Sequence, residues 1–199
     1  MSLLIKKEQP VGTQNDVIDG LIKDCIAGNR SAQYRLYKLY SAAMFNICIR
    51  MVNDKTEAED LLQEIFLKVF GDIGKFRGDC TFGVWVKRIT INHCLSWLRK
   101  RKLAFDDLGQ VPEESLAEDA FEEDSITPEM VHESIKSLPD SCRIIFVMHQ
   151  MEDYKHREIA AMLGVSESTS KSQFQHARKL LQNDLKKKCH ENEPGLIYR

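Results

Sequence analysis

The chain has 199 residues, of which 43% are hydrophobic and 29% charged, and its formal net charge is −2. That mixture excludes a disordered or fibrous protein, and the length accommodates one large domain or two small ones. No run approaches the roughly 18 consecutive apolar residues that a membrane span needs, and residues 1–10 contain no apolar signal-peptide core. We therefore expect a cytoplasmic protein with no direct membrane insertion.

A net charge near zero argues, by itself, against a nucleic-acid partner, since compact DNA-binding domains are usually strongly basic. The charge is unevenly distributed, however. Residues 85–102 sum to +6, residues 103–135 contain no Lys or Arg and sum to −11, and residues 171–188 sum to +5. Two basic segments on either side of an acidic one predict two domains and a linker.

The acidic segment has poor hydrophobic periodicity, contains Pro112 and Pro128, and carries charge of one sign. Such a segment buries too little apolar surface to offset the entropy lost on ordering. We predict a flexible linker over residues 104–129. A solvated spacer is the simpler interpretation of it, and an acidic mimic of nucleic acid is the alternative.

Cysteine spacing gives no sign of a metal site or a disulfide framework. None of the six lies in a CxxC or zinc-finger spacing, so reduced thiols are the simplest expectation. They are Cys25, Cys48, Cys80, Cys94, Cys142 and Cys189.

The N-terminal half reads as four helices, over about 16–27, 31–51, 56–70 and 83–102, with Ser31 and Thr56 as N-caps of the second and third. No convincing period-2 strand is present, so the fold class is all-α, with two small helical domains. The third helix has a regular apolar stripe at helical spacing. The stripe consists of Ala58, Leu61, Leu62, Ile65, Phe66 and Val69.

The C-terminal half predicts helices over about 140–151, 154–163 and 166–188. Residues 158–169 follow a helix-turn-helix pattern, in which Gly164 permits the turn, Ile159 and Leu163 face the core, and Ser166 caps the next helix. The second helix of such a motif lies in the DNA major groove.

A helical wheel of the last helix separates two faces. Ser170, Phe174, Ala177 and Leu181 lie on one side, and polar groups able to reach bases and phosphates lie on the other. An ordinary helical hairpin with a solvated face is the alternative, but the basic character of this helix favours DNA binding. The polar face consists of Ser168, Ser172, Gln175, His176 and Lys179, with Lys171 and Arg178 beside it.

The third helix carries a polar face opposite its apolar stripe, made of Glu57, Asp60, Gln63, Glu64 and Lys68. This face could be solvated, hold a metal, or meet a basic partner. The metal interpretation is weak because the only Glu-x-x-His spacing is Glu129 to His132. HExxH, a Gly-rich phosphate loop and GxSxG are all absent. We therefore expect no enzyme activity and no cofactor.

Aromatic and basic residues alternate after the third helix, in residues 76–82, 85–92 and 99–102. This composition suits the holding of unstacked bases beside a phosphate backbone. The alternative is that Phe76, Phe82 and Trp85 belong to a hydrophobic core.

These motifs together carry a family resemblance. Residues 57–70, followed by Trp85, Arg88 and Asn92, resemble region 2 of bacterial sigma-70-family factors. Ser137-Leu-Pro139, residues 158–166 and residues 171–180 resemble region 4 of the same family. The short length and the acidic linker are similar to the extracytoplasmic-function (group IV) subfamily.

The resemblance implies a domain organisation and a function. It implies an N-terminal tail (1–15), region 2 (16–103), the linker (104–129), region 4 (130–188) and a C-terminal tail (189–199). It further implies a factor that binds core RNA polymerase through the β′ coiled coil and the β flap and directs promoter-specific initiation. Promoter DNA and an anti-sigma factor are the other implied partners, with no small-molecule substrate. The linker would enter the polymerase RNA channel.

The resemblance also implies site residues. Core-polymerase contacts fall on Asp60, Gln63 and Glu64. Contacts with the melted −10 element fall on Phe76, Gly78, Asp79, Cys80, Thr81, Phe82, Lys87, Arg88 and Asn92. Contacts with the −35 element fall on Ser168, Lys171, Ser172, Gln175, His176 and Lys179.

Two residues depart from the family pattern. Ser170 replaces a usual apolar residue, and Gln173 replaces a frequent Arg, which we interpret as the loss of a phosphate contact. Two other functions stay open at this point: a stand-alone helix-turn-helix regulator that does not bind polymerase, and a helical metalloenzyme.

Overall fold

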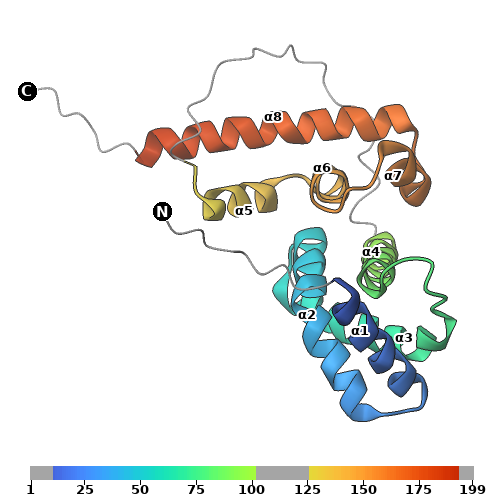
Figure 1. The fold of residues 1–199 in the computed structure, drawn as a ribbon. Coiled ribbons are helices and arrows are strands. Elements are labelled where there is room, and N and C mark those ends of the chain that lie inside the picture. The colour runs from blue at the N-terminus through green and yellow to red at the C-terminus, as the bar shows by residue number, and fades with distance from the viewer. Residues whose placement is uncertain (1–10, 102–125, 193–199) are drawn as a thin grey trace, which may run out of the picture. The chain divides into compact units, whose positions relative to one another are not determined.

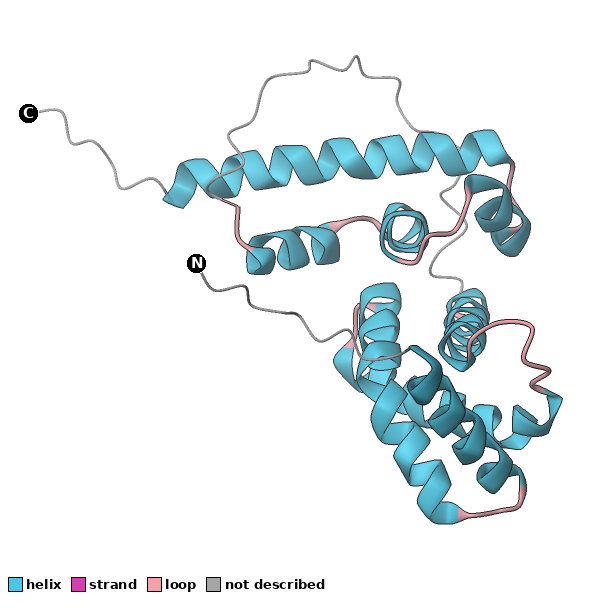
Figure 2. Cartoon of the chain, viewed as in Figure 1, coloured by secondary structure: helices cyan, strands magenta, loops and turns pink. Residues whose placement is uncertain are grey.

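The computed structural model describes residues 11–101 and 126–192, with side chains from 16 to 101 and from 126 to 189. Within these ranges the chain is helical and contains no strand (Figure 2), which confirms the all-α class. Most of the predicted linker (residues 104–125) and most of both predicted tails lie outside the described residues. None of the described helices is long and apolar enough to cross a bilayer.

The chain divides into two compact units. The first comprises residues up to Cys48 together with Lys55–His93, and the second comprises Ile49–Asp54 and the residues from Cys94 onward. The N-terminal helices are α1 (Val11–Ile26), α2 (Arg30–Val52), α3 (Lys55–Asp72) and α4 (Phe82–Lys100), as labelled in Figure 1, and the short 3-10 turn η1 (Ile73–Lys75) follows α3. All four predicted helices of this half are present.

Two predicted helix caps are wrong. The Asn29 side chain accepts hydrogen bonds from the backbone N–H groups of Ser31 and Ala32, at 2.9 and 3.2 Å, so Asn29 caps α2 and Ser31 does not. Helix α3 begins at Lys55, which places Thr56 inside its first turn. Asn29 and Ser31 are both residue types that cap helices, and the backbone geometry selects Asn29.

The apolar stripe of α3 is buried over all six predicted positions, which confirms the helical reading of this segment. Phe66 belongs to this stripe, and its ring meets the ring of Tyr37 edge-on with 4.8 Å between the ring centroids. On α4, Thr90 is completely buried and its hydroxyl donates to the Val86 carbonyl at 3.0 Å. The Thr90 hydroxyl therefore has a hydrogen-bond partner within α4, so the side of α4 that carries Thr90 can be buried without an unpaired polar group.

The C-terminal helices are α5 (Pro128–Ser137), α6 (Asp140–Phe146), the π-helical turn η3 (Val147–Met151), α7 (His156–Leu163) and α8 (Glu167–Asn192). Helix α5 was not predicted. Its signals are local: Pro128 opens it, and the Thr127 hydroxyl accepts the N–H of Met130 at 3.2 Å. These signals follow a strongly acidic segment, whose composition led to the prediction of a linker. Helix α5 begins at Pro128, so the last two residues of the predicted linker are helical.

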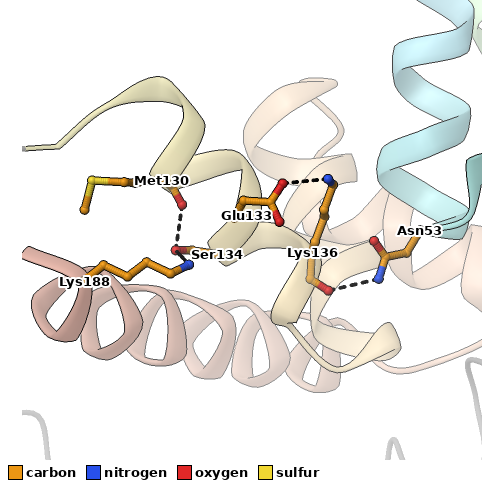
Figure 3. A network of polar contacts seen from close by, with 6 residues as sticks. All are labelled: Asn53, Met130, Glu133, Ser134, Lys136 and Lys188. Atoms are coloured by element: carbon orange, nitrogen blue, oxygen red, sulfur yellow. Dashed lines mark hydrogen bonds and ion pairs between the residues drawn. The ribbon is translucent and has the colours of Figure 1, made fainter. Parts of the chain in front are cut away.

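Helix α8 is the long element against which α5, α6 and α7 pack (Figure 1). Its C-terminal part is tied to α5 by Ser134, which is completely buried. The Ser134 hydroxyl donates to the Met130 carbonyl at 2.8 Å and accepts from Lys188 Nζ at 2.9 Å (Figure 3). Lys188 also forms an ion pair with Asp184 at 2.7 Å. A polar clasp therefore fixes α5 along the end of α8.

Candidate functional site

The helix-turn-helix consists of α7, a tight turn and α8. Gly164 adopts a left-handed conformation, with φ of 74°, and the N–H groups of Gly164 and Val165 both donate to the Ala160 carbonyl, at 2.9 and 3.1 Å. The Ser166 hydroxyl then accepts the N–H of Thr169 at 2.9 Å, as a helix N-cap does. The predicted turn and cap are confirmed, and Ile159 is fully buried beneath them.

The two predicted faces of α8 are confirmed. Ser170, Phe174, Ala177 and Leu181 are all buried, at 7% exposure or less. The opposite face is accessible: Ser168, Lys171, Ser172 and Gln175 are exposed, while His176 and Lys179 are half-buried. Lys171 forms an ion pair with Glu167, one turn before it, at 2.7 Å. This face therefore presents amide, hydroxyl and cationic groups together, the groups that read base edges and phosphates.

Gln173 does not lie on that accessible face. Its side chain is only 3% exposed, and its Oε1 atom accepts a hydrogen bond from the Cys142 thiol of α6 at 3.0 Å. The interpretation of this position as a lost phosphate contact is therefore wrong. In this chain a neutral amide fills an interior position and joins α8 to α6.

The polar face of α3 forms an exposed ridge. Asp60, Gln63 and Glu64 are exposed, as the polymerase-contact prediction requires. Leu67 continues the same ridge one turn later and is 75% exposed, the highest value among the large apolar side chains described as exposed. Sequence reasoning missed Leu67, although it follows Glu64 by three residues and Gln63 by four and therefore shares their side of the helix. The ridge thus combines acidic and apolar groups on a rigid helix.

The loop between η1 and α4 borders a pocket of about 460 Å³. The pocket holds most of the loop residues predicted to contact the −10 element, but it also includes residues of α1 and α2 that sequence reasoning missed. Its lining consists of Ile18, Asp19, Tyr40, Phe76, Gly78, Cys80, Thr81, Phe82 and Gly83.

Three aromatic residues, Tyr40, Phe76 and Phe82, line this pocket, and Trp85, which is not part of the lining, belongs to the same aromatic cluster. The rings of Phe76, Phe82 and Trp85 lie 5.5 Å apart pairwise, and Phe82 also meets Tyr40 at 5.4 Å. Phe82 is 3% exposed, so the core interpretation holds for it, whereas Phe76 and Trp85 are half-buried. Phe82 therefore supports the pocket wall and does not offer a free ring face.

The other predicted −10 residues lie outside the pocket lining. Asp79 is exposed in the loop. On α4, Arg88 and Asn92 are exposed and Lys87 is half-buried. The structure thus keeps the cations of α4 accessible and outside the enclosed space, where they can meet a phosphate backbone.

A second pocket, of about 440 Å³, lies where α6 and η3 meet α8. Sequence reasoning did not identify it, because its residues come from separate helices. Aromatic and aliphatic side chains make its floor, and amide and cationic groups lie at its edge. It is lined by Phe146, His149, Gln150, Phe174, Arg178, Leu181, Gln182 and Leu185.

Among the described residues, no group of three or more His, Cys, Asp or Glu side chains could hold a metal ion. Helix α5 contains both residues of the single Glu-x-x-His spacing, Glu129 and His132. The six cysteines form no disulfide, and four of them are buried. Cys80 is exposed in the pocket loop, and burial raises the pKa of the Cys142 thiol.

Two family models match the chain in order. The model for sigma-70 region 2 matches residues 36–104, and the model for sigma-70 region 4 matches residues 129–181. The chain is also 28% identical over 177 residues to the RNA polymerase sigma-H factor of Pseudomonas aeruginosa, covering 83% of this chain and 92% of that protein. It is 24% identical over 177 residues to the ECF RNA polymerase sigma factor SigW of Bacillus subtilis, covering 83% and 95%.

The fold has a counterpart among solved structures. The sigma factor RpoE of Bartonella quintana, solved in complex with the anti-sigma factor NepR, matches with a TM-score of 0.51 and 23% identity, covering 77% of this chain and 96% of that one. The two matched regions occur in family order and contain the α3 ridge and the helix-turn-helix. The chain belongs to the sigma-70 family, as a sigma factor of the extracytoplasmic-function subfamily that binds core RNA polymerase and directs transcription initiation at promoters.

Proposed function

We propose that the two regions divide the work of promoter recognition: α8 reads the −35 element as duplex, and the pocket loop with α4 captures the melted −10 strand. The observation that carries this assignment, against a regulator that acts without polymerase, is the α3 ridge of Asp60, Gln63, Glu64 and Leu67. An exposed acidic and apolar ridge is a surface for a basic protein partner and not for DNA.

At the −35 element, the exposed face of α8 would enter the major groove. Gln175 has an amide that can pair with adenine, and the Lys171 ammonium can donate to guanine or to phosphate. Ser168, Ser172, His176 and Lys179 would complete the contact. Because the turn and cap hold the first turn of α8 rigidly, these side chains start from a preorganised helix end.

At the −10 element, unpairing and unstacking a base costs a few kcal/mol, which contacts with the extruded base must offset. The pocket of about 460 Å³ offers an aromatic wall and a loop in which Gly78 has φ of 79°. Arg88, Asn92 and Lys87 on α4 would hold the backbone of the same strand. Binding energy would thereby be converted into strand opening, with no covalent step, so we assign no enzyme activity to the chain.

Polymerase docking would use two surfaces. The α3 ridge would meet the β′ coiled coil, with its carboxylates facing basic side chains. The pocket between α6, η3 and α8 has the apolar floor that receives an amphipathic helix, which suits the β flap.

The remaining assignments follow from the sigma-factor function. Polymerase and chromosomal DNA lie in the bacterial cytoplasm, so we place the chain there. The solved counterpart was captured with an anti-sigma factor, and such a partner for this chain is part of the proposal. We retain the linker between region 2 at 16–103 and region 4, with its predicted end at 129 moved back to the start of α5 at Pro128. Its charge of one sign would compete with DNA for the basic faces.

Run-off transcription with purified core polymerase on a promoter library tests the proposal. For wild type we expect core binding and promoter-dependent transcripts. For Asp60→Ala we expect both to be lost. A stand-alone regulator would instead bind palindromic DNA without core enzyme and be insensitive to Asp60→Ala. Core binding and transcripts equal to wild type in that variant would reject the α3 assignment.

A further inference from the structure

The imidazole rings of two histidines stack on each other at the start of the helix-turn-helix. His149 of η3 and His156, the first residue of α7, have ring centroids 4.1 Å apart and an interplanar angle of 23°. Both rings also meet the ring of Phe174 from α8, at 4.6 and 5.5 Å. The pair therefore lies where three helical elements converge.

Each imidazole has a defined hydrogen-bond partner. His149 Nδ1 lies 2.8 Å from the Tyr154 carbonyl, and because a carbonyl only accepts, this nitrogen carries a hydrogen and donates it. His156 Nδ1 lies 3.0 Å from the hydroxyl of Ser170, which is completely buried on α8. The second bond joins the first residue of α7 directly to the first turns of α8.

The hydrogen bond to His156 explains why position 170 holds a serine in place of the usual apolar residue. A hydrophobic side chain at position 170 would pack without direction, whereas a hydroxyl must point at its partner. Ser170 immediately precedes Lys171 and Ser172, two of the side chains assigned to the −35 element. A directional contact at Ser170 therefore sets the rotation at which α8 presents them.

The surroundings of His156 disfavour a positive charge. Burial lowers the pKa of His156, and His149 and Lys171 lower it further, while Glu167 on α8 acts in the opposite direction. Arg157 follows His156 in the chain and adds another cation near Glu167. Two stacked rings at 4.1 Å repel if both are charged, so the packed arrangement is that of a pair with at most one positively charged ring.

We propose that His156 is a positioning residue for −35 recognition, which fixes the first turns of α8 through Ser170, and that protonation of His156, whose ring stacks on His149, loosens this hold and weakens −35 binding in acid. The inference rests on the proposed reading of the −35 element by α8. Its consequence is a sigma factor whose use of −35-dependent promoters falls as the pH drops.

The test uses holoenzyme reconstituted from core polymerase and the full chain. Binding is measured at constant ionic strength between about pH 7.5 and 5.5, on a promoter fragment with the −35 element and on a premelted −10 fragment without it. For wild type we expect −35-dependent affinity to fall by about three- to tenfold across this range. The −10 fragment reports any general loss of holoenzyme, and its smaller change is the internal reference.

His156→Gln is the decisive variant, because glutamine can still contact Ser170 but does not titrate. We expect it to keep the affinity of wild type at pH 7.5 and to flatten the acid loss. Ser170→Val removes the hydroxyl, and we expect weaker −35 binding already at pH 7.5. Thermal unfolding followed by circular dichroism establishes that each variant is folded. An acid profile of His156→Gln that overlays wild type, or wild-type affinity in Ser170→Val, overturns the proposal.

Gln175→Ala separates this inference from the proposed function. If Gln175→Ala weakens −35 binding while His156→Gln keeps the wild-type acid profile, only the positioning role fails. If Gln175→Ala has no effect, the assigned DNA face of α8 fails, and the His156→Gln profile still decides whether the histidine pair controls −35-dependent binding.

Discussion

His93 Nε2 of α4 lies 2.8 Å from the carboxylate Oε2 of Glu64 on α3. The carboxylate assigned to polymerase is thus held by a side chain from the helix assigned to the −10 strand. Glu64 remains 64% exposed, so the contact restricts its rotamers without hiding it from a partner.

The first prediction concerns this pair. We expect His93→Leu to weaken core-polymerase binding by about two- to fivefold, because an exposed pair contributes modestly and mainly by orienting Glu64. Glu64→Ala should weaken binding more. Fluorescence titration of labelled chain with core enzyme measures both, and His93→Gln, which can still donate to Glu64, serves as the matched control. Unchanged binding in His93→Leu, alongside a loss in Glu64→Ala, would show that Glu64 needs no such support.

The second prediction concerns Leu67, whose side chain is 75% exposed on the α3 ridge. We expect Leu67→Asp to weaken core binding by at least tenfold, about 1.4 kcal/mol, because apolar area that a partner buries is replaced by a charge. Leu39→Asp is the matched control, since Leu39 of α2 is 58% exposed and outside the ridge. Equal losses of core binding in Leu67→Asp and Leu39→Asp would mean that Leu67 does not lie in the interface with polymerase.

The third prediction separates −35 reading from docking. We expect Lys171→Ala and Gln175→Ala each to cost about 1–3 kcal/mol in −35-dependent binding while core binding stays at the wild-type value. The Lys171 variant should also reduce the salt dependence, if its contact is to phosphate. Lys187→Ala, which changes an exposed lysine near the other end of α8, is the control. Electrophoretic mobility shifts at several salt concentrations distinguish these cases.

The fourth prediction tests the pocket beside the −10 loop. A Cβ at Gly83 would lie 3.1 Å from Cε1 of Tyr40, so Gly83→Ala must displace a ring that lines the pocket. We expect slower open-complex formation with −35 binding intact, measured by permanganate footprinting and mobility shift. Gly74→Ala is the control, because its Cβ would meet nothing within 4 Å. Normal strand opening in the Gly83 variant would argue that the pocket takes no base.

The fifth prediction concerns the clasp between α5 and α8 (Figure 3). Lys188 and Ser134 lower the pKa of Asp184, so its carboxylate is favoured by the fold. This contribution is present above the ordinary pKa of about 3.8 and is lost as the pH falls through the lower folded value. We expect Lys188→Met to reduce the free energy of unfolding by about 0.5–1 kcal/mol at pH 7.

Urea unfolding measures this difference, and Lys187→Met is its neighbouring control. As the pH falls through the lowered pKa of Asp184, its carboxyl becomes protonated in both proteins, and the difference in unfolding free energy between Lys188→Met and wild type should narrow. A gap that stays constant with pH would assign the effect to the lysine stem and not to the ion pair.

Local patterns in the sequence were sufficient for several parts of the structure. The spacing of apolar residues determined the buried face of α3, and the same argument separated the faces of α8. Gly164 and Ser166 identified the turn and the cap, because each is a position where one residue type meets a specific backbone requirement. Charge composition hid one helix, since the signals at Thr127 and Pro128 are short and follow a strongly acidic run.

Periodicity and single residue types therefore specify the properties of individual helices: which face of α3 is buried, which side of α8 is accessible, and where the helix-turn-helix bends. Every contact between two helices depends on how the helices pack. The tertiary structure brought Tyr40 to the −10 loop, turned Gln173 toward Cys142, and stacked His149 on His156 beside Ser170. Periodicity gives the direction in which a side chain points around the axis of its helix. The residue that this side chain contacts depends on how neighbouring helices pack.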